Sequence, residues 1–446
     1  MLTLEGYKIA KKDISNLNHM KSLLNVRPYI PSVFVKPQYV KKYPVYKEDS
    51  EFLYVPKHFG IQHFGPLKSS LRNITKQNES NWEFNGSIRT NQEEVIKSFL
   101  CPEPRDGIIS LQTGGGKTVC ALFIASKLRV PTIILVHNTF LRDQWIDRIR
   151  AFLPKARIGS IQGDKIDIKE KDIVVAMLQS ISLKDYSTEV FENFGLLIVD
   201  ECHHIASESF SQAIPKLTCQ YMLGLSATPE RKDKLMHVIN WFLGPILYKS
   251  DTSDKKDENV KVEVYEFEPD NEEFNTIIYN SQGVMFTSLM VNKLVEFQER
   301  NKFLVEILLD VIEDKRQLLV LSDRVDHLKT LFELFPSEIQ EQACILGREV
   351  KSEQRTIWCS TKKVLLATYQ MCKEGFDVAT LNTLIIATPR PDVDQIVGRI
   401  LRTEKVGREI NPLIIDIVDS TFRRQFQSRL SLYNSRNYKV EKMKLI

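Results

Sequence analysis

Short apolar runs recur along the chain from residue 107 onward, and each is followed by a polar or glycine-containing stretch and then by a helical pattern. Strands of this length that alternate with helices are typical of parallel sheets covered on both faces. The sequence therefore predicts an α/β fold. The expected strands are 107–111, 132–136, 172–177, 195–199, 221–225, 317–321, 363–367, 383–387 and 412–417.

These strands fall into two groups, separated by a charged region that is poor in apolar residues. A chain of 446 residues is long enough for two or three domains, each with its own core. We therefore expect a first sheet domain at 81–249, a connecting segment at 250–300 and a second sheet domain at 301–446. Residues 1–80 would form a small N-terminal domain.

The composition excludes several classes of protein. No apolar run approaches the roughly 20 residues that cross a bilayer, and the first residues lack the apolar core of a secretion signal. The seven cysteines contain no CxxC pair and do not form a disulfide framework. We expect an intracellular protein, in a reducing compartment, that does not insert into a membrane.

The N-terminal segment has a charge of its own. The whole chain has a net charge of only +4, yet residues 1–80 hold 13 Lys and Arg against 6 Asp and Glu, with ten Phe and Tyr interleaved. Lysine attracts phosphate and an aromatic face stacks on a base, so this segment is a candidate nucleic-acid grip. The alternative is a folded cap, in which the aromatics form the core and the lysines a solvated rim.

The first chemical motif, LQTGGGKT, follows the first expected strand. Gly114, Gly115 and Gly116 lack the Cβ atoms that would block a tight loop, so that backbone N–H groups can point at phosphate oxygens. Lys117 can then reach the β and γ phosphates, and the Thr118 hydroxyl can bind Mg²⁺. The alternative is an ordinary glycine turn, which the position between a strand and a helix disfavours.

The second motif is LLIVDECHH, a strand that ends in two carboxylates. Asp200 would hold the Mg²⁺ shared with the loop threonine, and Glu201 would orient and deprotonate a water molecule. A zinc site of Cys202, His203 and His204 is the alternative, but consecutive residues do not easily converge on one tetrahedral ion. We expect His203 to link the carboxylates to the next motif.

The third motif is GLSATPERKD, with Ser226 and Thr228 after another short strand. With LQTGGGKT, DECH and SATPER at these spacings, residues 85–425 resemble the superfamily 2 helicases and translocases of the DEAD/DEAH-like group. The resemblance implies two RecA-like domains that bind ATP and Mg²⁺ in the cleft between them, with nucleic acid across both. It also implies that Ser226 and Thr228 couple the binding of ATP to the binding of nucleic acid.

Further family motifs can be matched in the first domain. IRTNQEEV resembles the element that reads adenine, with Gln92 as the contact to the base. LVHNTFLRDQW and AMLQSIS resemble motifs that hold the nucleic-acid backbone. The resemblance assigns that role to Gln144, next to Trp145, and to Gln179 and Ser180. Such side chains contact phosphates without reading bases. Ordinary loops are the alternative.

The second domain carries the remaining motifs. LLVLSDRVDHLKTL and VLLATYQMCKEGFDVATLNTLIIAT resemble the fourth and fifth family motifs. The resemblance places Ser322 and Thr368 toward the nucleic acid, and Gly375 and Asp377 toward the interdomain cleft.

DVDQIVGRILR resembles the sixth motif, with the spacing QxxGRxxR. On a helix, Gln395, Arg399 and Arg402 lie on one face. There the two guanidinium groups would neutralise the charge that grows during phosphoryl transfer. Gln395 would couple the ATP site to the nucleic-acid site. Salt-bridged surface arginines are the alternative.

Within the superfamily, the details resemble the branch that contains XPB, the phage helicase UvsW and the poxvirus transcript-release helicase. This branch shares a P-loop that begins with Leu, here Leu111, and a QW ending in its second motif. ERKD resembles its Arg-Glu-Asp element, although the order of the residues differs. YVPKHFGIQHFG resembles helicases of large DNA viruses.

We therefore expect an ATP-dependent helicase or translocase, acting on DNA rather than RNA, with 3′ to 5′ movement implied by the family. We expect a monomer in the nucleus or cytoplasm of a host cell, or packaged in a virion, working with transcription or repair machinery. Two alternatives stay open. One is a translocase that anneals or remodels DNA, or releases transcripts, without net unwinding. The other is a non-catalytic nucleic-acid-binding protein.

Overall fold

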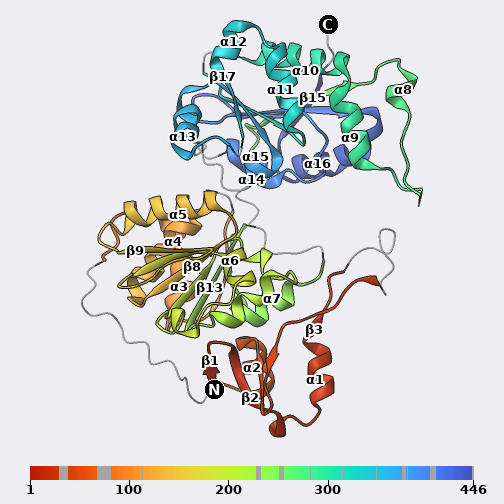
Figure 1. Cartoon of the computed structure of the whole chain (residues 1–446). Coiled ribbons are helices and arrows are strands. Elements are labelled where there is room, and N and C mark those ends of the chain that lie inside the picture. The colour runs from red at the N-terminus through yellow and green to blue at the C-terminus, as the bar shows by residue number, and fades with distance from the viewer. Residues whose placement is uncertain are drawn as a thin grey trace. The chain divides into compact units, whose positions relative to one another are not determined.

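The computed structural model forms two compact units, residues 1–250 and 251–446 (Figure 1). It describes residues 1–29, 39–67, 82–112, 114–227, 233–250, 256–281, 283–312, 315–347, 349–373, 378, 380–401 and 408–443. In this part of the chain, no helix is both long and apolar enough to span a membrane. Short 3₁₀ turns lie at Lys11–Asp13, Thr188–Val190, Cys202–His204, Phe210–Gln212, Ile214–Lys216 and Ser420–Phe422.

The first unit is built on an eight-stranded sheet of strand order β10-β9-β11-β8-β12-β13-β7-β14. All neighbouring strands are parallel except the edge strand β10. All five expected strands of the first group are present. In sheet order the strands are Lys165–Asp167, Ile158–Gln162, Ile173–Met177, Thr132–Val136, Leu196–Val199, Tyr221–Ser226, Gly107–Ser110 and Ile246–Lys249.

Helices cover both faces of this sheet because successive strand residues point to opposite sides. On one face, Ile109 joins a cluster with α3 (Thr90–Leu100), α4 (Lys117–Leu128) and α5 (Thr139–Phe152). On the other, Ile108 joins a cluster with α6 (Leu178–Leu183) and α7 (Met236–Leu243).

The N-terminal segment packs on the α7 side and shares that second cluster. We call residues 1–29 and 39–67 the cap. It holds an antiparallel sheet of order β1-β2-β6-β5, a separate ribbon of β3 and β4, and helices α1 and α2 (Figure 1). In chain order its elements are β1 (Leu2–Thr3), β2 (Gly6–Ala10), α1 (Leu17–Leu23), β3 (Asn25–Val26), β4 (Tyr43–Pro44), β5 (Lys47–Glu48), β6 (Phe52–Val55) and α2 (Lys57–Phe64).

Part of the expected aromatic core of the cap is present. Tyr7, Tyr43 and Phe59 are buried, and the ring of Phe59 meets that of Trp241 on α7 edge to face at 5.0 Å. Tyr29 and Tyr39, in contrast, are exposed. Among the described aromatic residues of the N-terminal segment, some therefore belong to the core and others to the surface.

The second unit is a parallel seven-stranded sheet of order β17-β18-β16-β19-β20-β15-β21. Its strands, in that order, are Ala343–Leu346, Val364–Thr368, Leu318–Ser322, Thr383–Ile386, Leu413–Asp419, Lys261–Phe267 and Lys439–Met443. Its helices are α8 (Glu272–Asn275), α9 (Thr287–Glu296), α10 (Gln298–Val311), α11 (Val325–Leu334), α12 (Ser337–Gln342), α13 (Ser352–Thr361), α14 (Tyr369–Lys373), α15 (Asp394–Ile400) and α16 (Arg423–Ser435). Helices α10 and α11 share a core with one face of the sheet, and α15 and α16 with the other.

The expected connecting segment at 250–300 needs correction. β15 lies inside the second sheet, paired along its length with β20, and Val262 and Val264 on it are fully buried. Helix α9 also lies within 250–300. The second unit therefore begins at Asp251 rather than at residue 301.

Candidate functional site

Three predicted motifs of the first unit meet at one edge of its sheet. Strands β12, β13 and β7 are neighbours and parallel, so their carboxyl ends lie side by side. The glycine loop follows β7, Asp200 and Glu201 follow β12, and Ser226 ends β13. The N–H of Leu111 donates to the carbonyl of Ser226 at 3.1 Å and joins two of these ends directly. Ligands of open α/β sheets bind outside such strand ends.

The glycine loop has a backbone that requires glycine. Gly114 and Gly116 have φ angles of +83° and +85°, which side chains with a Cβ rarely adopt. A Cβ at Gly116 would also lie 2.1 Å from Nε2 of Gln92. Gly115 N–H closes a turn onto the Gln112 carbonyl at 3.0 Å. Helix α4 begins at Lys117, so Lys117 and Thr118 lie in its first turn, where backbone N–H groups favour anions.

Lys117 and Glu201 form the central ion pair of the site. Lys117 Nζ lies 3.1 Å from Glu201 Oε1, and both side chains are largely buried. Glu201 has a φ of +45°, a strained conformation for a residue other than glycine. Strain of this kind costs about 1 to 3 kcal/mol and clusters at functional sites.

Asp200 is held by two hydrogen bonds. Its Oδ2 accepts from the indole N–H of Trp145 at 2.8 Å, and its Oδ1 accepts from the backbone N–H of Glu201 at 3.0 Å. Burial and the neighbouring Glu201 charge raise the pKa of Asp200 to about 6. Burial also acts to raise the pKa of Glu201, but the positive charge of Lys117 and the contact with His203 outweigh it and hold that pKa below its usual range.

The role of Trp145 is the functional feature that sequence reasoning missed. Its side chain is only 1% exposed, and the indole N–H reaches Asp200 from α5. In the sequence, the QW ending resembles only part of a backbone-binding motif. One signal was available, because a buried indole N–H needs an acceptor.

His203 connects the carboxylates with the third motif. Its Nδ1 lies 3.3 Å from Glu201 Oε2 and 3.2 Å from Ser226 Oγ. This is the link expected for His203. The neighbouring Cys202 takes no part in this link. Its side chain is fully buried, and burial raises the pKa of its thiol.

The donor set fits Mg²⁺ better than a metal held by protein ligands alone. Across the described parts of the chain, no group of three or more His, Cys, Asp and Glu side chains is arranged to hold a metal ion. Mg²⁺ is typically held by one or two carboxylates, substrate phosphates and water. Asp200, the Thr118 hydroxyl and the phosphates of a nucleotide make up such a set.

The other predicted residues of the first unit lie around this edge. Gln92 is 4% exposed in the first turn of α3, where its Oε1 accepts the N–H of Arg89 at 3.0 Å. Gln144 is half-buried on α5, and Gln179 is exposed at the start of α6. The Ser180 hydroxyl accepts the N–H of Gly163 at 2.9 Å. Their contacts with base and backbone stay predictions, and Thr228 lies outside the described residues.

In the second unit, the role expected for Ser322 needs correction. Ser322 ends β16 but is fully buried. Its hydroxyl is hydrogen-bonded to His327 Nδ1 at 2.9 Å and accepts the N–H of Arg324 at 3.1 Å. A hydroxyl enclosed in this way cannot also contact a nucleic-acid backbone. Its position instead shapes the loop after β16.

Thr368 ends β18 and is half-buried, with its hydroxyl accepting the N–H of Met371 at 3.3 Å. Gln395 and Arg399 both lie on α15, Gln395 half-buried and Arg399 9% exposed. Gly375, Asp377 and Arg402 lie outside the described residues.

Comparison with known proteins identifies the family of the chain. Residues 85–231 match the family described as "Type III restriction enzyme, res subunit". Over 99% of its length, the chain is 31% identical to the protein called "Putative ATP-dependent RNA helicase" in Acanthamoeba polyphaga mimivirus, and covers 86% of that protein. The chain belongs to the superfamily 2 helicases of large DNA viruses. A "Putative helicase" of Invertebrate iridescent virus 6 is 26% identical, over 89% of this chain and 91% of the relative.

Solved structures show the fold of this helicase. S. cerevisiae Dbp5 bound to RNA and ADP–BeF3 aligns with a TM-score of 0.56 at 15% identity, covering 79% of this chain and 89% of that one. The Type ISP restriction-modification enzyme LlaBIII bound to DNA aligns with a TM-score of 0.58 at 13% identity, covering 81% of this chain and 31% of that enzyme. The α/β fold with two RecA-like domains is thereby confirmed.

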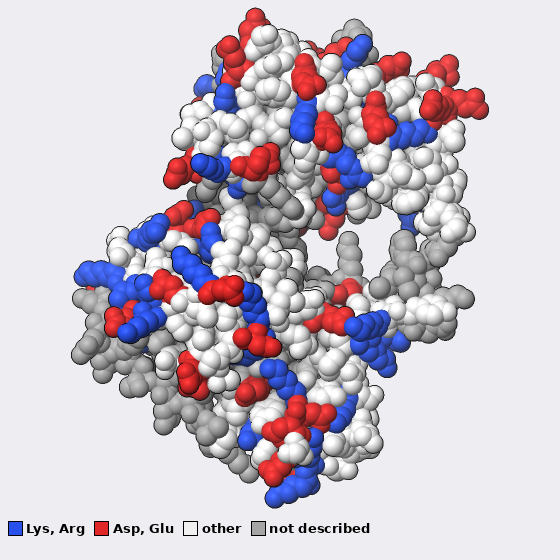
Figure 2. Space-filling view, in the orientation of Figure 1, with Lys and Arg blue, Asp and Glu red and all other residues white. Residues whose placement is uncertain are grey.

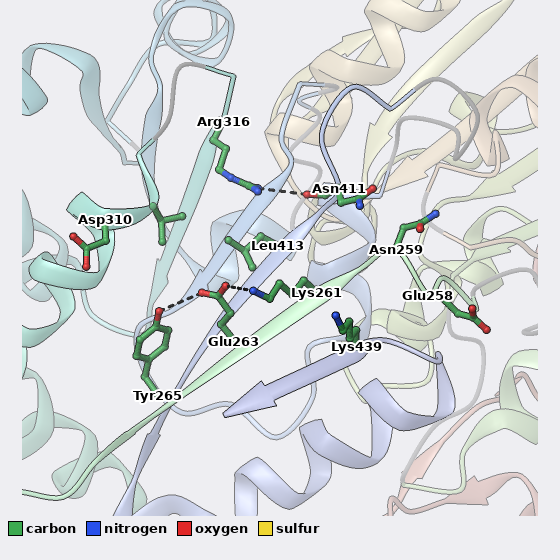
Figure 3. A pocket seen from close by; sticks show the side chains of 11 residues that line it. Glu258, Asn259, Lys261, Glu263, Tyr265, Asp310, Arg316, Asn411, Leu413 and Lys439 are labelled. Carbon is green, nitrogen blue, oxygen red and sulfur yellow. Dashed lines mark hydrogen bonds and ion pairs between the residues drawn. The ribbon is translucent and has the colours of Figure 1, made fainter. Parts of the chain in front are cut away.

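The second unit of the helicase has a cavity of about 460 Å³ (Figure 3). It lies at the amino ends of the strands, where Lys261 begins β15 and Lys439 begins β21, whereas the motif residues follow carboxyl ends. Several of its polar groups bond to one another. Lys261 Nζ lies 2.8 Å from Glu263 Oε1, and the Tyr265 hydroxyl donates to Glu263 Oε2 at 3.2 Å (Figure 3). This cavity is therefore not the candidate site.

Proposed function

We propose that this helicase is a Mg²⁺-dependent ATPase that nucleic acid stimulates, and that it moves 3′ to 5′ along one DNA strand and separates a duplex. The observation that carries the proposal is the pair of Lys117 and Glu201 at 3.1 Å, beside an Asp200 fixed by two hydrogen bonds. A cation, a base and a metal ligand are the three groups that ATP hydrolysis needs at one sheet edge.

Each side chain then has one task. Lys117 leaves Glu201 and binds the phosphates, which frees the Glu201 carboxylate to orient a water molecule and accept its proton. Mg²⁺ held by Asp200 and Thr118 would supply charge neutralisation at the phosphates. His203 bonds to both Glu201 and Ser226, so a change at the carboxylate can reach the end of β13.

The second unit contributes guanidinium groups. We propose that Arg399 and Arg402 neutralise the charge that develops on the γ-phosphate, as the QxxGRxxR spacing implies. Such groups contribute on the order of 10³ to 10⁵ in rate. Gln144, Gln179, Ser180 and Thr368 would hold the nucleic-acid backbone.

DNA is the proposed substrate because the motif details resemble a DNA-processing branch. The name of the mimivirus relative specifies RNA, so RNA is the essential competitor in any test. We further propose that the helicase acts with transcription or repair machinery in the infected host cell.

The experiment is an ATPase assay with single-stranded DNA, forked duplex, RNA–DNA hybrid and RNA in parallel at one salt concentration, since affinity for nucleic acid depends on salt. Single-stranded DNA should stimulate turnover most, and the fork should be separated only with ATP. Lys117→Ala and Glu201→Gln should lower stimulated turnover by roughly 10² to 10⁴. Lys127→Ala, at the far end of the same helix, is the matched control.

The outcomes separate the alternatives. Stimulated turnover without strand separation would indicate a translocase that remodels rather than unwinds. Turnover that no nucleic acid raises would overturn the proposal. A Glu201→Gln variant as active as the Lys127→Ala control would remove Glu201 from the role of base.

A further inference from the structure

The ribbon of the cap brings two distant stretches of sequence to one end. Strands β3 and β4 pair antiparallel, with Asn25 opposite Pro44 and Val26 opposite Tyr43. Residues 27–29, which follow β3, and residues 39–42, which precede β4, therefore lie at the same end of this strand pair. From here on, the ribbon means residues 25–29 and 39–44.

This end of the ribbon exposes both aromatic rings and positive charge. Tyr29 is 51% exposed and Tyr39 71%, whereas Tyr43 beside them is 3% exposed and belongs to the core. Arg27 and Lys42 are also exposed. Over the region of β3, Figure 2 shows Lys and Arg side chains gathered on the surface. Two aromatic rings left in solvent beside cations need an explanation that the core of the cap does not supply.

The ribbon is fixed to the body of the first unit. The N–H of Tyr29 donates to the carbonyl of Asp233 at 2.9 Å, and Lys234 Nζ lies 4.5 Å from the centroid of the Tyr29 ring. Lys41 Nζ lies 2.5 Å from Glu208 Oε1. Glu208 thus offsets much of the Lys41 charge, whereas Lys42 and Lys234 add exposed positive charge beside the ribbon. Asp233 follows Ser226 by only seven positions, so the ribbon contacts the segment that leaves the nucleotide-side edge of the sheet.

We propose that the ribbon is a binding site for single-stranded nucleic acid, with Tyr39 stacking on a base and Lys42 and Lys234 holding phosphates. Aromatic platforms beside cations bind single strands regardless of sequence, because every base has a stacking face and every nucleotide a phosphate. An acidic protein partner would bind the same cations but would not require an exposed aromatic ring. The inference rests on the proposed function for the identity of its ligand, but not on turnover.

The test measures binding without nucleotide, by fluorescence anisotropy of labelled oligothymidine and oligouridine of about 20 nucleotides, which exceeds one binding site. Tyr39→Ala should weaken binding of either strand by about 5- to 150-fold, the fold-change that corresponds to one lost stack. Lys42→Ala should reduce the slope of log affinity against log salt by about 0.7, the value for one phosphate contact on a single strand. The oligothymidine and oligouridine arms show whether the ribbon prefers DNA or RNA.

The controls are Tyr279→Ala, a tyrosine of the second unit that is 58% exposed, and Lys127→Ala on α4. Unchanged thermal melting of the ribbon variants, expected for exposed positions, shows that they fold. If the wild-type chain binds neither strand, the ribbon site is overturned, whereas the proposed function fails only if no nucleic acid raises ATP turnover in the assay above. If it binds and Tyr39→Ala and Lys42→Ala bind as the controls do, only the ribbon site is overturned.

Discussion

Asp200 has its two oxygens fixed by donors from different parts of the chain. One is the adjacent backbone N–H, and the other is the Trp145 indole, 55 residues away on α5. A carboxylate held at both oxygens keeps one orientation for a metal ion, and partners of this kind typically change metal affinity or activity 10- to 100-fold when lost. Trp145 is therefore a positioning residue for the candidate magnesium ligand.

Trp145→Phe keeps an aromatic ring but removes the N–H donor. We expect the Mg²⁺ concentration needed to bind a fluorescent ADP analogue to rise by roughly 10- to 100-fold, while binding at saturating Mg²⁺ recovers. Trp241→Phe, in the contact between α7 and the cap, is the control. An unchanged Mg²⁺ requirement would show that the indole only fills space.

We expect His327 to make the stability of the second unit depend on pH. It is 2% exposed and bonds Ser322 through Nδ1 and Asn301 through Nε2. Burial, together with the nearby Arg300 charge, lowers the pKa of His327 to about 3. Between that value and about 6.5 the unfolded chain binds a proton that the folded chain does not. The stability contributed by neutral His327 is therefore fully present above pH 6.5 and is lost as the pH falls.

This predicts a loss of roughly 1.4 kcal/mol in the free energy of unfolding for each pH unit below about 6. His327→Gln should lack this component, so urea unfolding at several pH values should show the two proteins converging as the pH falls. The exposed His237→Gln should follow the wild type. A constant gap between wild type and His327→Gln would contradict the assignment.

Asp200 and Glu201 were predictable because their chemistry requires them directly after a strand, and Lys117 because its glycine loop joins a strand to a helix. Ser322 follows a strand in the same way, and there the inference was wrong. Its environment depends on His327, and a motif does not reveal which partner folds onto a hydroxyl. The same limit hid Trp145, whose acceptor lies on another element.

Strands were predictable where both faces are buried, since their apolar runs are continuous. β15 was not predicted as a strand because its sequence, KVEVYEF, alternates apolar residues with charged ones. Its buried Val262 and Val264 face the core, while Glu263 lies at the cavity of Figure 3. Its place between β20 and the edge strand β21 follows from pairing with two strands that are distant in sequence.

Helix α10 is joined to two strand ends by a buried ion pair. Arg300 and Asp419 are both fully buried, with Nε to Oδ1 at 2.6 Å and Nη2 to Oδ2 at 3.0 Å, and Nη2 also donates to the Ala387 carbonyl at 2.9 Å. Asp419→Asn should cost about 3 to 5 kcal/mol in urea unfolding, because it leaves a buried charge uncompensated.

The double variant Arg300→Met with Asp419→Leu should recover much of this loss, because it removes both desolvated charges. Lys329→Ala, which breaks the exposed pair with Asp326, should cost less than about 1 kcal/mol. Equal costs for Asp419→Asn and Lys329→Ala would mean that the buried pair does not hold α10 in place.

The cap is part of the first unit rather than an appendage to it. Lys57 Nζ lies 2.6 Å from Asp106 Oδ2, and both side chains are 6% exposed. Asp106 also accepts the N–H of Met222 at 3.0 Å, and Lys57 donates to the Gln220 carbonyl at 2.7 Å. The sequence showed that residues 1–80 are basic and aromatic. It could not show this pair, which depends on α2 meeting the residues just before β7 and β13.

We therefore predict that deleting residues 1–67 yields an aggregating protein, because the deletion uncovers the apolar face of α7 and removes the Lys57 partner of Asp106. Light scattering and melting of the purified deletion protein are the measurements.

Lys57→Met, which keeps the apolar stem but not the charge, should lower the free energy of unfolding by about 3 to 5 kcal/mol. Lys12→Ala, at an exposed position of the cap, should leave it nearly unchanged. A soluble deletion protein that melts like the wild type would show that the first unit folds without its cap. If the deletion does aggregate, the ribbon can be tested only by point variants, because losing the cap would abolish binding through misfolding alone.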